Sequence, residues 1–486
     1  MKLVIFDQDL RINDNIALYA AIKQSNLDGE PIAAIYIFDE INKRARGGAS
    51  KWFLHHILES LQQNLQQKIG CKLNFMIGDS LDILNDIADN LVIKEIYLNQ
   101  NFDPKAQNLI HNIDKFAQKK DIKTYIHEAN LLFESGSILN GSNQYFKVFT
   151  PFWKKCLLSE EKISKPLPIL TLKKSYLDSK AQDYFAKNSL NLNSLNLLPK
   201  ISWDEVMQKT WQFSEDDILK NFDDFIAKKI SNYKQSRDFP GLKSTSKLSP
   251  YLHFGVISVR YIFEKVRIFQ KSHDQLHNKD INHFLSEIGW REFSYNLLHN
   301  HPDLLTKNFN TKFNKFPWYK NDDILARWQK GQTGYPIVDA GMRELYATGW
   351  MHNRVRMVVG SFLVKDLLID WRQGEEWFWD CLVDADPASN SASWQWIAGS
   401  GADAAPYFRI FNPTLQSQRF DPKGIYLRKW VPEIAKLSDK LIHEPSQANM
   451  FELKEAGIEL GKDYPHPIIN HSKARDMAMM AYKSLG

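Results

Sequence analysis

The sequence has little cysteine, no long apolar run and no glycine-rich nucleotide loop, and each shortage excludes a class of protein. The three cysteines, Cys71, Cys156 and Cys381, lie far apart without a CxxC pair, which argues against a zinc site or a disulfide framework. No apolar run approaches the roughly 20 residues that span a bilayer, and the N-terminus "MKLVIFDQDL" does not read as a signal peptide. We therefore expect a cytoplasmic protein with no membrane segment and no bound metal.

The size and composition indicate a soluble protein of two domains. At 486 residues the chain is too long for one ordinary core. Apolar residues make up 43% and charged residues 24%, which is typical of globular proteins. The net charge of +5 is compatible with a polyanionic partner but does not establish one. Ten of the 14 tryptophans lie between residues 290 and 430, so the C-terminal half carries a heavy aromatic load.

The first 130 residues alternate between short β-rich runs and amphipathic helical patterns. The predicted strands are "KLVIF", "PIAAIYIF", "KLNFMI", "EIYL" and "KTYIH", with a helical pattern between each pair. This alternation predicts a doubly wound α/β domain with a parallel sheet. The turn after the first strand, "FDQDLRINDN", has no GxGxxG, so we expect no dinucleotide site of the common Rossmann type there.

The rest of the chain has a different pattern. Residues 131–202 lose the alternation, and residues 179–200 are polar and rich in Asn and Ser, which predicts a surface connection. From about residue 203 onward the pattern is helical, most clearly over 280–301, 336–350 and 353–383. We therefore expect an α/β domain over 1–130, a long connection over 131–202 and an all-α domain over 203–486.

The segment "SRDFPGLKSTSKLSPYLHFG" (236–255) gathers hydroxyl groups and a lysine just before a predicted helix. Ser249 followed by Pro250 predicts a helix N-cap and a first-turn proline. Amide groups at a helix start, together with Thr245, Ser246 and Lys247, could hold a phosphate or pyrophosphate. An ordinary capped helix after a polar loop is the simpler interpretation, and the segment alone does not decide between them.

Two predicted helices carry charged residues beside aromatic ones. In "FLSEIGWREF", Glu287 and Arg291 are four residues apart, and they form either an exposed ion pair or part of a cleft wall. The neighbouring Trp290 favours a cleft, because a large indole is costly to leave in water. In "TGWMHNRVRMVVGSF", Arg354 and Arg356 are two residues apart and cannot share a helix face. We expect one to point outward and the other to meet a buried acid.

The stretch "DCLVDADPASNSASWQWIAGSG" (380–401) supplies such acids in Asp384 and Asp386. Two carboxylates could also form an acid/base pair, but no histidine or third acid lies nearby in the sequence to support that role. Large core aromatics are the default interpretation of the tryptophans around this stretch, which are Trp371, Trp377, Trp379, Trp394 and Trp396.

Together and in this order, the motifs resemble the photolyase/cryptochrome family over essentially the whole chain. The match is densest from Tyr233 to Trp430, through "RDFPGLKSTSKLSPYL", "EIGWREF", "GYPIVDAGMRELYATGWMHNRVRM", "SFLVKDLLIDWRQGE", "DADPASNSASWQWIAGSGADAAPYFRIFNP" and "FDPKGIYLRKW". Within the family the chain resembles most the bacterial class I-like cyclobutane pyrimidine dimer (CPD) photolyases. The resemblance implies an α/β antenna domain, a helical domain that binds FAD, and a monomeric enzyme that acts on DNA containing pyrimidine dimers.

The resemblance assigns a U-shaped FAD to the helical domain. Asp384 and Asp386 match the acids beside the flavin ring and the ribityl chain, with Arg356 as the partner of Asp384. Asn390 matches the residue that faces flavin N5 and tunes the redox state. The other positions that match cofactor-binding residues are Tyr233, Thr245, Ser246, Lys247, Leu248, Ser249, Asn353 and Ala385.

Three tryptophans, Trp394, Trp371 and Trp318, match the indoles that relay an electron from the surface to photoexcited oxidised flavin in this family. Indole is the most easily oxidised common side chain, so such a series can return an electron to the flavin by short hops. The implied reaction is driven by light. Reduced FAD donates an electron to the dimer, the cyclobutane ring splits, and the electron returns with no net redox change.

The same resemblance implies a lesion cavity that receives the flipped-out dimer. Glu287 would hydrogen-bond the flipped bases, while Trp290 and Trp396 would offer apolar faces to the thymine rings. Phosphate contacts would make DNA binding dependent on salt. The other positions that match contacts with the dimer or the DNA are Arg237, Arg291, Asn353, Arg354, Met357 and Gln416.

The antenna chromophore is less determined, because the N-terminal motifs depart from the family pattern. Asp7 stands where the family commonly has arginine, and "GGASKWFLHH" (47–56) departs from the enzymes that bind methenyltetrahydrofolate. Asp103 stands where those enzymes carry a glutamate on the pterin, and Leu305 and Thr306 replace two further contacts. We expect methenyltetrahydrofolate first, with deazaflavin, a second flavin or no antenna as alternatives.

Two other functions within the family stay open. A cryptochrome shares the fold and the FAD but acts as a blue-light receptor; signalling members often carry a C-terminal extension, whereas this sequence ends soon after "HSKARDMAMMAYKSLG". A (6-4) photolyase has histidine where this chain has Asn353. Both the residue at that position and the presence of Glu287, Trp290 and Met357 favour repair of cyclobutane dimers.

Overall fold

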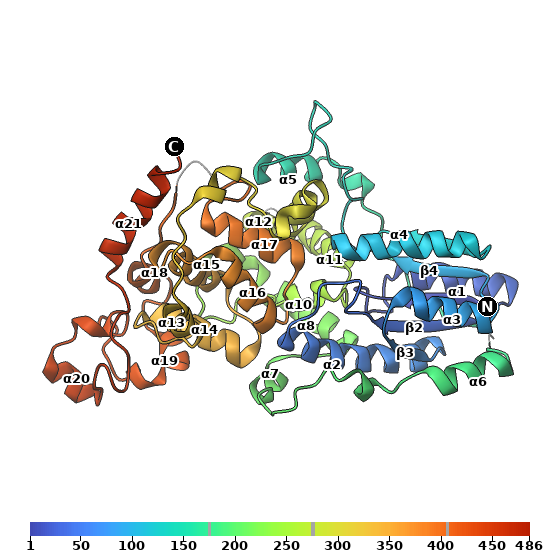
Figure 1. Ribbon diagram of the computed structural model, residues 1–486, viewed down its shortest axis with the longest axis horizontal. Helices are drawn as coiled ribbons and strands as arrows, with labels where there is room; N and C mark the ends of the chain where they lie inside the picture. The colour runs from blue at the N-terminus through green and yellow to red at the C-terminus, as the bar shows by residue number, and fades with distance from the viewer. Residues whose placement is uncertain (174–175, 274–277, 405–407) are drawn as a thin grey trace.

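Figure 1 shows the computed structural model, in which an α/β half and a helical half lie side by side. The structure describes residues 1–173, 176–273, 278–404 and 408–486. Residues 405–407 of the long motif "DADPASNSASWQWIAGSGADAAPYFRIFNP" lie outside these ranges. Within the described ranges, no helix has both the length and the apolar character that crossing a membrane requires.

The N-terminal half is a parallel sheet of five strands in the order β3-β2-β1-β4-β5. Alternate residues of β1 point to opposite faces, and each face is covered by its own pair of helices: Val4 and Phe6 pack toward α1 and α2, whereas Leu3 and Ile5 pack toward α3 and α4. This is the predicted doubly wound fold. The strands are β1 (Lys2–Phe6), β2 (Ile32–Phe38), β3 (Leu73–Ile77), β4 (Glu95–Asn99) and β5 (Lys123–His127), and the helices are α1 (Ile16–Asp28), α2 (Gly48–Asn64) with its π-helical end η1 (Leu65–Ile69), α3 (Ser80–Asn90) and α4 (Pro104–Lys119).

The segment that the composition predicted as a polar surface connection contains a helix. α6 (Ser179–Asn188) begins at Asp178, whose side chain accepts a hydrogen bond from the Ala181 N–H. Ala181 and Phe185 form a short apolar stripe that packs on the α3 and α4 side of the sheet. Two buried apolar positions are too few to produce a recognisable helical pattern in a sequence so rich in Asn and Ser. The other short elements of the connection are α5 (Phe149–Leu157) and the 3-10 turns η2 (Glu160–Lys162) and η3 (Leu192–Leu195).

The second half is helical, as the sequence predicted. Residues of α14 to α17 pack together in one core, whereas residues of α8 and α10 to α12 share a core with the α1 and α2 face of the sheet. The helices are α7 (Glu205–Thr210), α8 (Glu215–Lys228), α9 (Tyr233–Ser236), α10 (Ser249–His253), α11 (Val259–Ser272), α12 (Asn278–Asn300), α13 (Asp322–Gln329), α14 (Pro336–Thr348), α15 (Asn353–Ser361), α16 (Trp371–Cys381), α17 (Pro387–Ala398), α18 (Pro413–Phe420), α19 (Ile425–Trp430), α20 (Met450–Ala456) and α21 (His471–Lys483). Short turns are η4 (Ile230–Asn232), η6 (Pro302–Leu305), η7 (Thr311–Lys315), η8 (Phe362–Asp366), η9 (Pro432–Ile434) and η10 (Pro445–Gln447).

Two local predictions are wrong. The helix expected over 353–383 is broken after the π-helical turn η8, because Leu368 adopts a left-handed conformation with φ 53° and Asp370 starts α16 as a new N-cap. Ser249 is the first residue of α10 and not its cap, since Leu248 holds the cap position and makes no side-chain hydrogen bond there. The Ser249 hydroxyl instead accepts a hydrogen bond from Trp350 Nε1 at 3.3 Å.

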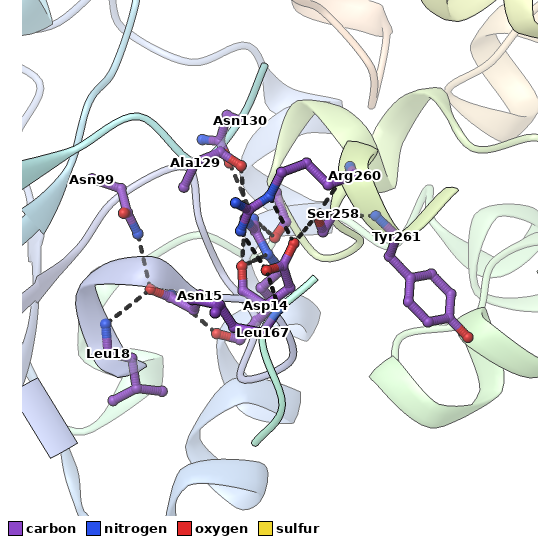
Figure 2. A network of polar contacts seen from close by, with 12 residues as sticks. Asp14, Asn15, Leu18, Asn99, Ala129, Asn130, Leu167, Ser258, Arg260 and Tyr261 are labelled. Carbon is purple, nitrogen blue, oxygen red and sulfur yellow. Dashed lines mark hydrogen bonds and ion pairs between the residues drawn. The ribbon is translucent and has the colours of Figure 1, made fainter. Parts of the chain in front are cut away.

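A buried polar network joins the two halves (Figure 2). The Asp14 carboxylate, which follows β1, accepts hydrogen bonds from the Arg260 guanidinium at the start of α11. Arg11 Nη1 donates to the carbonyl of Gly255 at 2.7 Å. Gly255 has a φ of 64°, and a Cβ there would lie 2.1 Å from the carbonyl oxygen of residue 8, so this approach requires glycine. These contacts hold the carboxyl ends of the strands against the helical half.

Candidate functional site

Two buried acids lie at the start of α17. Asp386 is the N-cap of that helix: its Oδ1 accepts the Ser389 N–H at 2.8 Å, and Pro387 follows in the first turn. The Asp384 carboxylate accepts two hydrogen bonds from Arg356 Nη2, at 2.8 and 3.0 Å. The sequence predicted this pairing of Arg356 on α15 with a buried acid. Arg354 points elsewhere, as expected for an arginine two positions away.

Asp386 is held as a carboxylate. Burial alone would raise its pKa, but the His253 imidazole, the Arg291 charge and the Tyr295 hydroxyl outweigh burial and lower the pKa to about 2. Tyr295 Oη donates to Asp386 Oδ2, and His253 Nδ1 lies 3.5 Å from the same oxygen. Burial lowers the pKa of His253, so the imidazole is neutral at pH 7 and donates to the carboxylate.

The Asn390 side chain is oriented by Glu375. Asn390 Nδ2 donates to the main-chain oxygen of Glu375 at 3.2 Å and to its Oε1 at 2.9 Å, so both amide protons have acceptors. The amide oxygen is therefore the group of Asn390 that remains available to a hydrogen-bond donor. Glu375 is 3% exposed and accepts from Arg44 Nη1 and Nη2 at 2.9 and 2.8 Å. Arg44 comes from the loop after β2, and its guanidinium lies 3.7 Å from the Trp379 ring centroid.

The loop before α10 offers unpaired donors. The main-chain N–H groups of residues 245–248 and the side chains of Thr245, Ser246 and Lys247 donate no hydrogen bond to any residue that the structure describes. Lys247 has a φ of 53°, and its ammonium lies 4.9 Å from the Trp350 ring. Consecutive free amides, two hydroxyls and a cation fit an anionic phosphate group.

Trp350 and α10 connect this loop with the acids of α17. Trp350 Nε1 donates to Ser249, and the Arg356 guanidinium lies 5.9 Å from the Trp350 ring. At the other end of α10, His253 reaches Asp386. The loop before α10 and the Asp384–Asp386 pair therefore belong to one site.

Three further residues expected on the cofactor side are buried. Tyr233, Leu248 and Ala385 are 5%, 5% and 2% exposed, respectively. The Arg237 guanidinium lies 5.5 Å from the Tyr233 ring and donates to Glu287 Oε1. One turn of α9 thus carries a cofactor-side residue and a residue of a second polar cluster.

The second cluster consists of two ion pairs on neighbouring elements. Arg237 of α9 pairs with Glu287 of α12, and Arg354 Nη2 of α15 donates to Asp238 Oδ2 at 2.8 Å. Arg354 Nη1 lies 3.8 Å from the Met357 sulfur, one turn along the same helix. Four of these five side chains come from the set expected to contact the dimer or the DNA, and Asp238 is the addition.

The alternative of an exposed Glu287–Arg291 pair is not what the structure shows. Arg291 Nη1 donates to the carbonyl of Asn130 at 2.7 Å and lies 3.4 Å from Glu292, so Arg291 faces the connection. Trp290, between them, is 36% exposed. Its position fits a cavity wall better than a core.

Two of the remaining predicted contacts, Asn353 and Gln416, lie next to this cluster in the chain or one turn from its neighbours. Asn353 is exposed at the start of α15, directly before Arg354. Gln416 is half-buried on α18, one turn before Phe420, whose ring lies 4.4 Å from the Arg354 guanidinium. Trp396 is half-buried on α17, two residues after Trp394.

The three tryptophans that the resemblance predicted as a relay lie along α16 and its neighbours. The Trp394 indole packs on Gly374, where a Cβ would lie only 2.2 Å from the ring. Gly374 is about one helical turn after Trp371, which is fully buried. The main chain next to Trp318 donates a hydrogen bond at 2.7 Å to the carbonyl of Leu368, three residues before Trp371. Trp318 is half-buried, so the series runs from the interior toward the surface.

A second cleft opens at the carboxyl edge of the sheet. Asp7 and Asp103, two of the positions that depart from the family pattern, line it, together with Lys43 and Arg44. Burial would raise the pKa of Asp7, but the Lys43 ammonium at 2.8 Å and other partners lower it. Leu305 and Thr306 do not belong to this lining. The cleft is therefore lined by charged residues of both signs.

The sequence did not identify Glu375, Arg44, Tyr295, His253 or Asp238. Each acts through a partner that is distant in the chain; Arg44 and Glu375, for example, are 331 positions apart. The only local signal was that Glu375 lies in the motif "SFLVKDLLIDWRQGE" at its acidic end.

Comparisons with known proteins agree with this geometry. Residues 2–170 match the family model described as DNA photolyase, and residues 284–484 match the FAD binding domain of DNA photolyase. The deoxyribodipyrimidine photo-lyase of Agrobacterium fabrum is 41% identical over 99% of this chain and 98% of its own length. Cryptochrome-1 of Arabidopsis thaliana is 34% identical over 98% of this chain and 69% of its own length.

Solved structures show the same relationship. The crystal structure of a bacterial class III photolyase from Agrobacterium tumefaciens has a TM-score of 0.91 and 41% identity, covering 100% of this chain and 97% of that one. The sequence resemblance pointed to class I-like enzymes, whereas this structural relative is a class III enzyme. A cryptochrome from Synechocystis sp. PCC6803 has a TM-score of 0.87 at 30% identity, covering 99% of each chain. The chain belongs to the DNA photolyase family, with an α/β photolyase domain followed by a helical FAD-binding domain.

Proposed function

We propose that this protein is a light-driven CPD photolyase that splits cyclobutane pyrimidine dimers in DNA. The observation that carries the proposal is the sharing of helices between the two polar clusters. On α12, Glu287 belongs to the Arg237 cluster, while Tyr295 binds Asp386. On α15, Arg354 pairs with Asp238 of the same cluster as Glu287, while Arg356 pairs with Asp384. A substrate at one cluster and a cofactor at the other would therefore contact the same two helices.

The residues present fit FAD. The unpaired donors of residues 245–248 would hold its pyrophosphate, and the Asp384–Arg356 pair and Asp386 would face the flavin ring and ribityl chain. When bound and reduced, FAD supplies the electron that splits the dimer after blue light is absorbed. The amide oxygen of Asn390, fixed by Glu375, would accept a hydrogen bond from a protonated flavin N5. Tyr233, Leu248, Ser249, Asn353 and Ala385 would complete the pocket.

The second cluster would hold the flipped dimer. Glu287 would accept hydrogen bonds from the bases, and Trp290 and Trp396 would cover their apolar faces and exclude water. Met357 would pack against the rings. The DNA backbone would be bound by positive and amide side chains, which are Arg237, Arg291, Asn353, Arg354 and Gln416.

Trp394, Trp371 and Trp318 would carry electrons from the surface to the oxidised cofactor. The proposal is supported by their exposure: Trp394 is 4% exposed and Trp371 is 0% exposed, whereas Trp318 is half-buried and so lies nearer the surface. Trp394 packs on Gly374, about one helical turn from Trp371, and a main-chain hydrogen bond joins the residue after Trp318 to Leu368, three residues before Trp371. These steps would be short enough for an electron to hop between indoles.

The cleft at the sheet edge is our proposed antenna site. Methenyltetrahydrofolate is the first choice because the family resemblance favours it, and the cleft that would receive it is lined by Lys43, Arg44 and Trp379. Deazaflavin and a second flavin are alternatives. The crystal structure of an archaeal photolyase from Sulfolobus tokodaii, 28% identical to this chain, is described as holding two FAD molecules. That description favours a second flavin as the strongest alternative.

A cryptochrome function is the second candidate, since the relatives that are at least 30% identical to this chain include cryptochromes. A (6-4) photolyase is the third. The test uses purified, reduced protein and three oligonucleotides, which carry a cyclobutane dimer, a (6-4) product or no lesion. We expect blue light to restore thymines only in the dimer oligonucleotide, with no change in the dark. Restoration of the (6-4) oligonucleotide alone would reassign the substrate, and FAD binding without repair of either would favour the cryptochrome.

A further inference from the structure

The connection between the halves supports one face of Trp290. The Phe149 ring of α5 stacks on the Trp290 indole with a centroid separation of 3.8 Å and an interplanar angle of 8°. Phe293, one turn after Trp290, contacts both rings edge-on, at 6.0 Å from Phe149 and 5.9 Å from Trp290. Phe149 is 9% exposed and Trp290 is 36% exposed. The indole thus has one covered face, while its other face has no aromatic partner among the described residues.

Phe149 is firmly held against α12. Trp153, one turn later on α5, packs on Gly289 of α12, where a Cβ would lie 2.5 Å from the indole. The Trp153 ring therefore lies directly against the main chain of α12. Figure 1 shows α5 at the upper edge of the molecule, beside α12. Phe149 is therefore not a loose surface ring that happens to meet Trp290.

The same residue reaches the second tryptophan of the proposed lesion cavity. The Phe149 N–H donates to Asp403 Oδ2 at 3.4 Å, and Trp396 Nε1 donates to the carbonyl of Asp403 at 3.2 Å. Asp403 has a left-handed φ of 57°, which turns its side chain and its carbonyl toward different partners. The start of α5 thus contacts both indoles, directly for Trp290 and through one residue for Trp396.

We propose that Phe149 is a positioning residue for recognition of the lesion, and that Asp403 extends its effect to Trp396. This inference rests on the proposed function, because it assumes that both tryptophans face the dimer. An unsupported indole would rotate about its side-chain bonds and lose entropy on meeting the bases. The stack with Phe149 fixes the orientation of the Trp290 indole before the dimer binds. It also leaves a single face for the ligand, so a non-planar pair of linked pyrimidines meets a fixed wall.

The chain offers matched variants for the test. Phe149→Leu keeps an apolar side chain of similar volume and removes the stack, whereas Phe149→Tyr keeps the stack. Phe152→Leu is the control on the same helix: Phe152 is 2% exposed, packs on Phe146 and Phe293, and makes no ring contact with Trp290. Binding is measured by fluorescence anisotropy on an oligonucleotide with one thymine dimer and on the same oligonucleotide without it. FAD content is the check on folding.

We expect Phe149→Leu to weaken binding of the dimer oligonucleotide about tenfold, as loss of one aromatic stack predicts, while binding of the undamaged oligonucleotide stays unchanged. In repair assays the KM should rise by the same factor, with kcat at saturating DNA retained. Phe149→Tyr and Phe152→Leu should bind the dimer as the parent protein does. Equal dimer binding by Phe149→Leu and the parent, or the same loss in Phe152→Leu, would overturn the inference. A parent protein that binds both oligonucleotides equally would instead overturn the proposed function.

Discussion

Replacing Asp14 by asparagine should loosen the joint between the two halves of the molecule. Asp14 is 2% exposed and Arg260 is 7% exposed, and the two form a buried ion pair (Figure 2). The substitution keeps the side-chain volume and removes the charge, which leaves the Arg260 guanidinium buried without its counter-charge. Removing one partner of a buried ion pair costs about 3 to 5 kcal/mol. We expect about 3 kcal/mol, because asparagine retains one oxygen that can accept from Arg260 or Ser258.

This free energy converts to a measurable melting temperature. At about 2.1 cal/mol/K per residue, unfolding of 486 residues has an entropy of about 1 kcal/mol/K, so Asp14→Asn should lower Tm by about 3 °C. Thermal melting followed by circular dichroism measures the change. Asp224→Asn is the control, because Asp224 and Lys228 form an exposed pair on α8 whose loss should leave Tm unchanged. Equal Tm values for Asp14→Asn and the parent would refute the reasoning that the buried charge holds the joint.

Three further predictions concern the relay, a buried acid and DNA binding. Trp394→Phe should block photoreduction of oxidised FAD while sparing repair by pre-reduced protein; photoreduction at the parent rate, followed by absorption, would remove Trp394 from the relay. Burial raises the pKa of Glu292 from 4.5 to about 7, so the folded chain keeps a proton that the unfolded chain loses, and the stability from this group falls by about 3 kcal/mol as the pH rises from about 4.5 past 7. Glu292→Gln should abolish that fall. Urea unfolding at pH 5 and pH 8 measures the change in unfolding free energy, and an equal change in the variant and the parent would contradict the reasoning. If Arg237, Arg291 and Arg354 bind three phosphates of duplex DNA, log K should fall with log salt with a slope of about −2.7, which titrations at several salt concentrations measure; a slope near zero would exclude phosphate contacts.

Much of the fold could be predicted from the sequence because its signals are local. Runs such as "PIAAIYIF" are apolar on both faces, and in the structure residues Ile32–Phe38 are all buried in a parallel sheet. The helical period of residues 280–301 likewise appears as α12. Local geometry also predicted that only one of Arg354 and Arg356 would meet a buried acid, since two arginines two positions apart must point in different directions. The choice of Arg356 came from the family resemblance.

The misses arose where a distant residue decides the outcome. Glu287 pairs with Arg237 and not with Arg291, because α9 brings a guanidinium against α12 that no spacing rule could foresee. The orientation of Asn390 depends on Glu375 and, through it, on Arg44 of the other half. In each case a local pattern gave the residue type, and tertiary packing chose its partner.

The central claim is that the Asp384–Asp386 site and the Arg237–Glu287 cluster form one electron-transfer site, and fluorescence of the reduced flavin tests it most directly. Purified, reduced protein would be excited with near-ultraviolet light in the presence of an oligonucleotide with one thymine dimer, and then with the undamaged oligonucleotide. We predict that the dimer oligonucleotide shortens the flavin fluorescence lifetime, because an electron leaves the excited flavin for the dimer, and that the undamaged one does not. A lifetime that stays the same with bound dimer would contradict the claim.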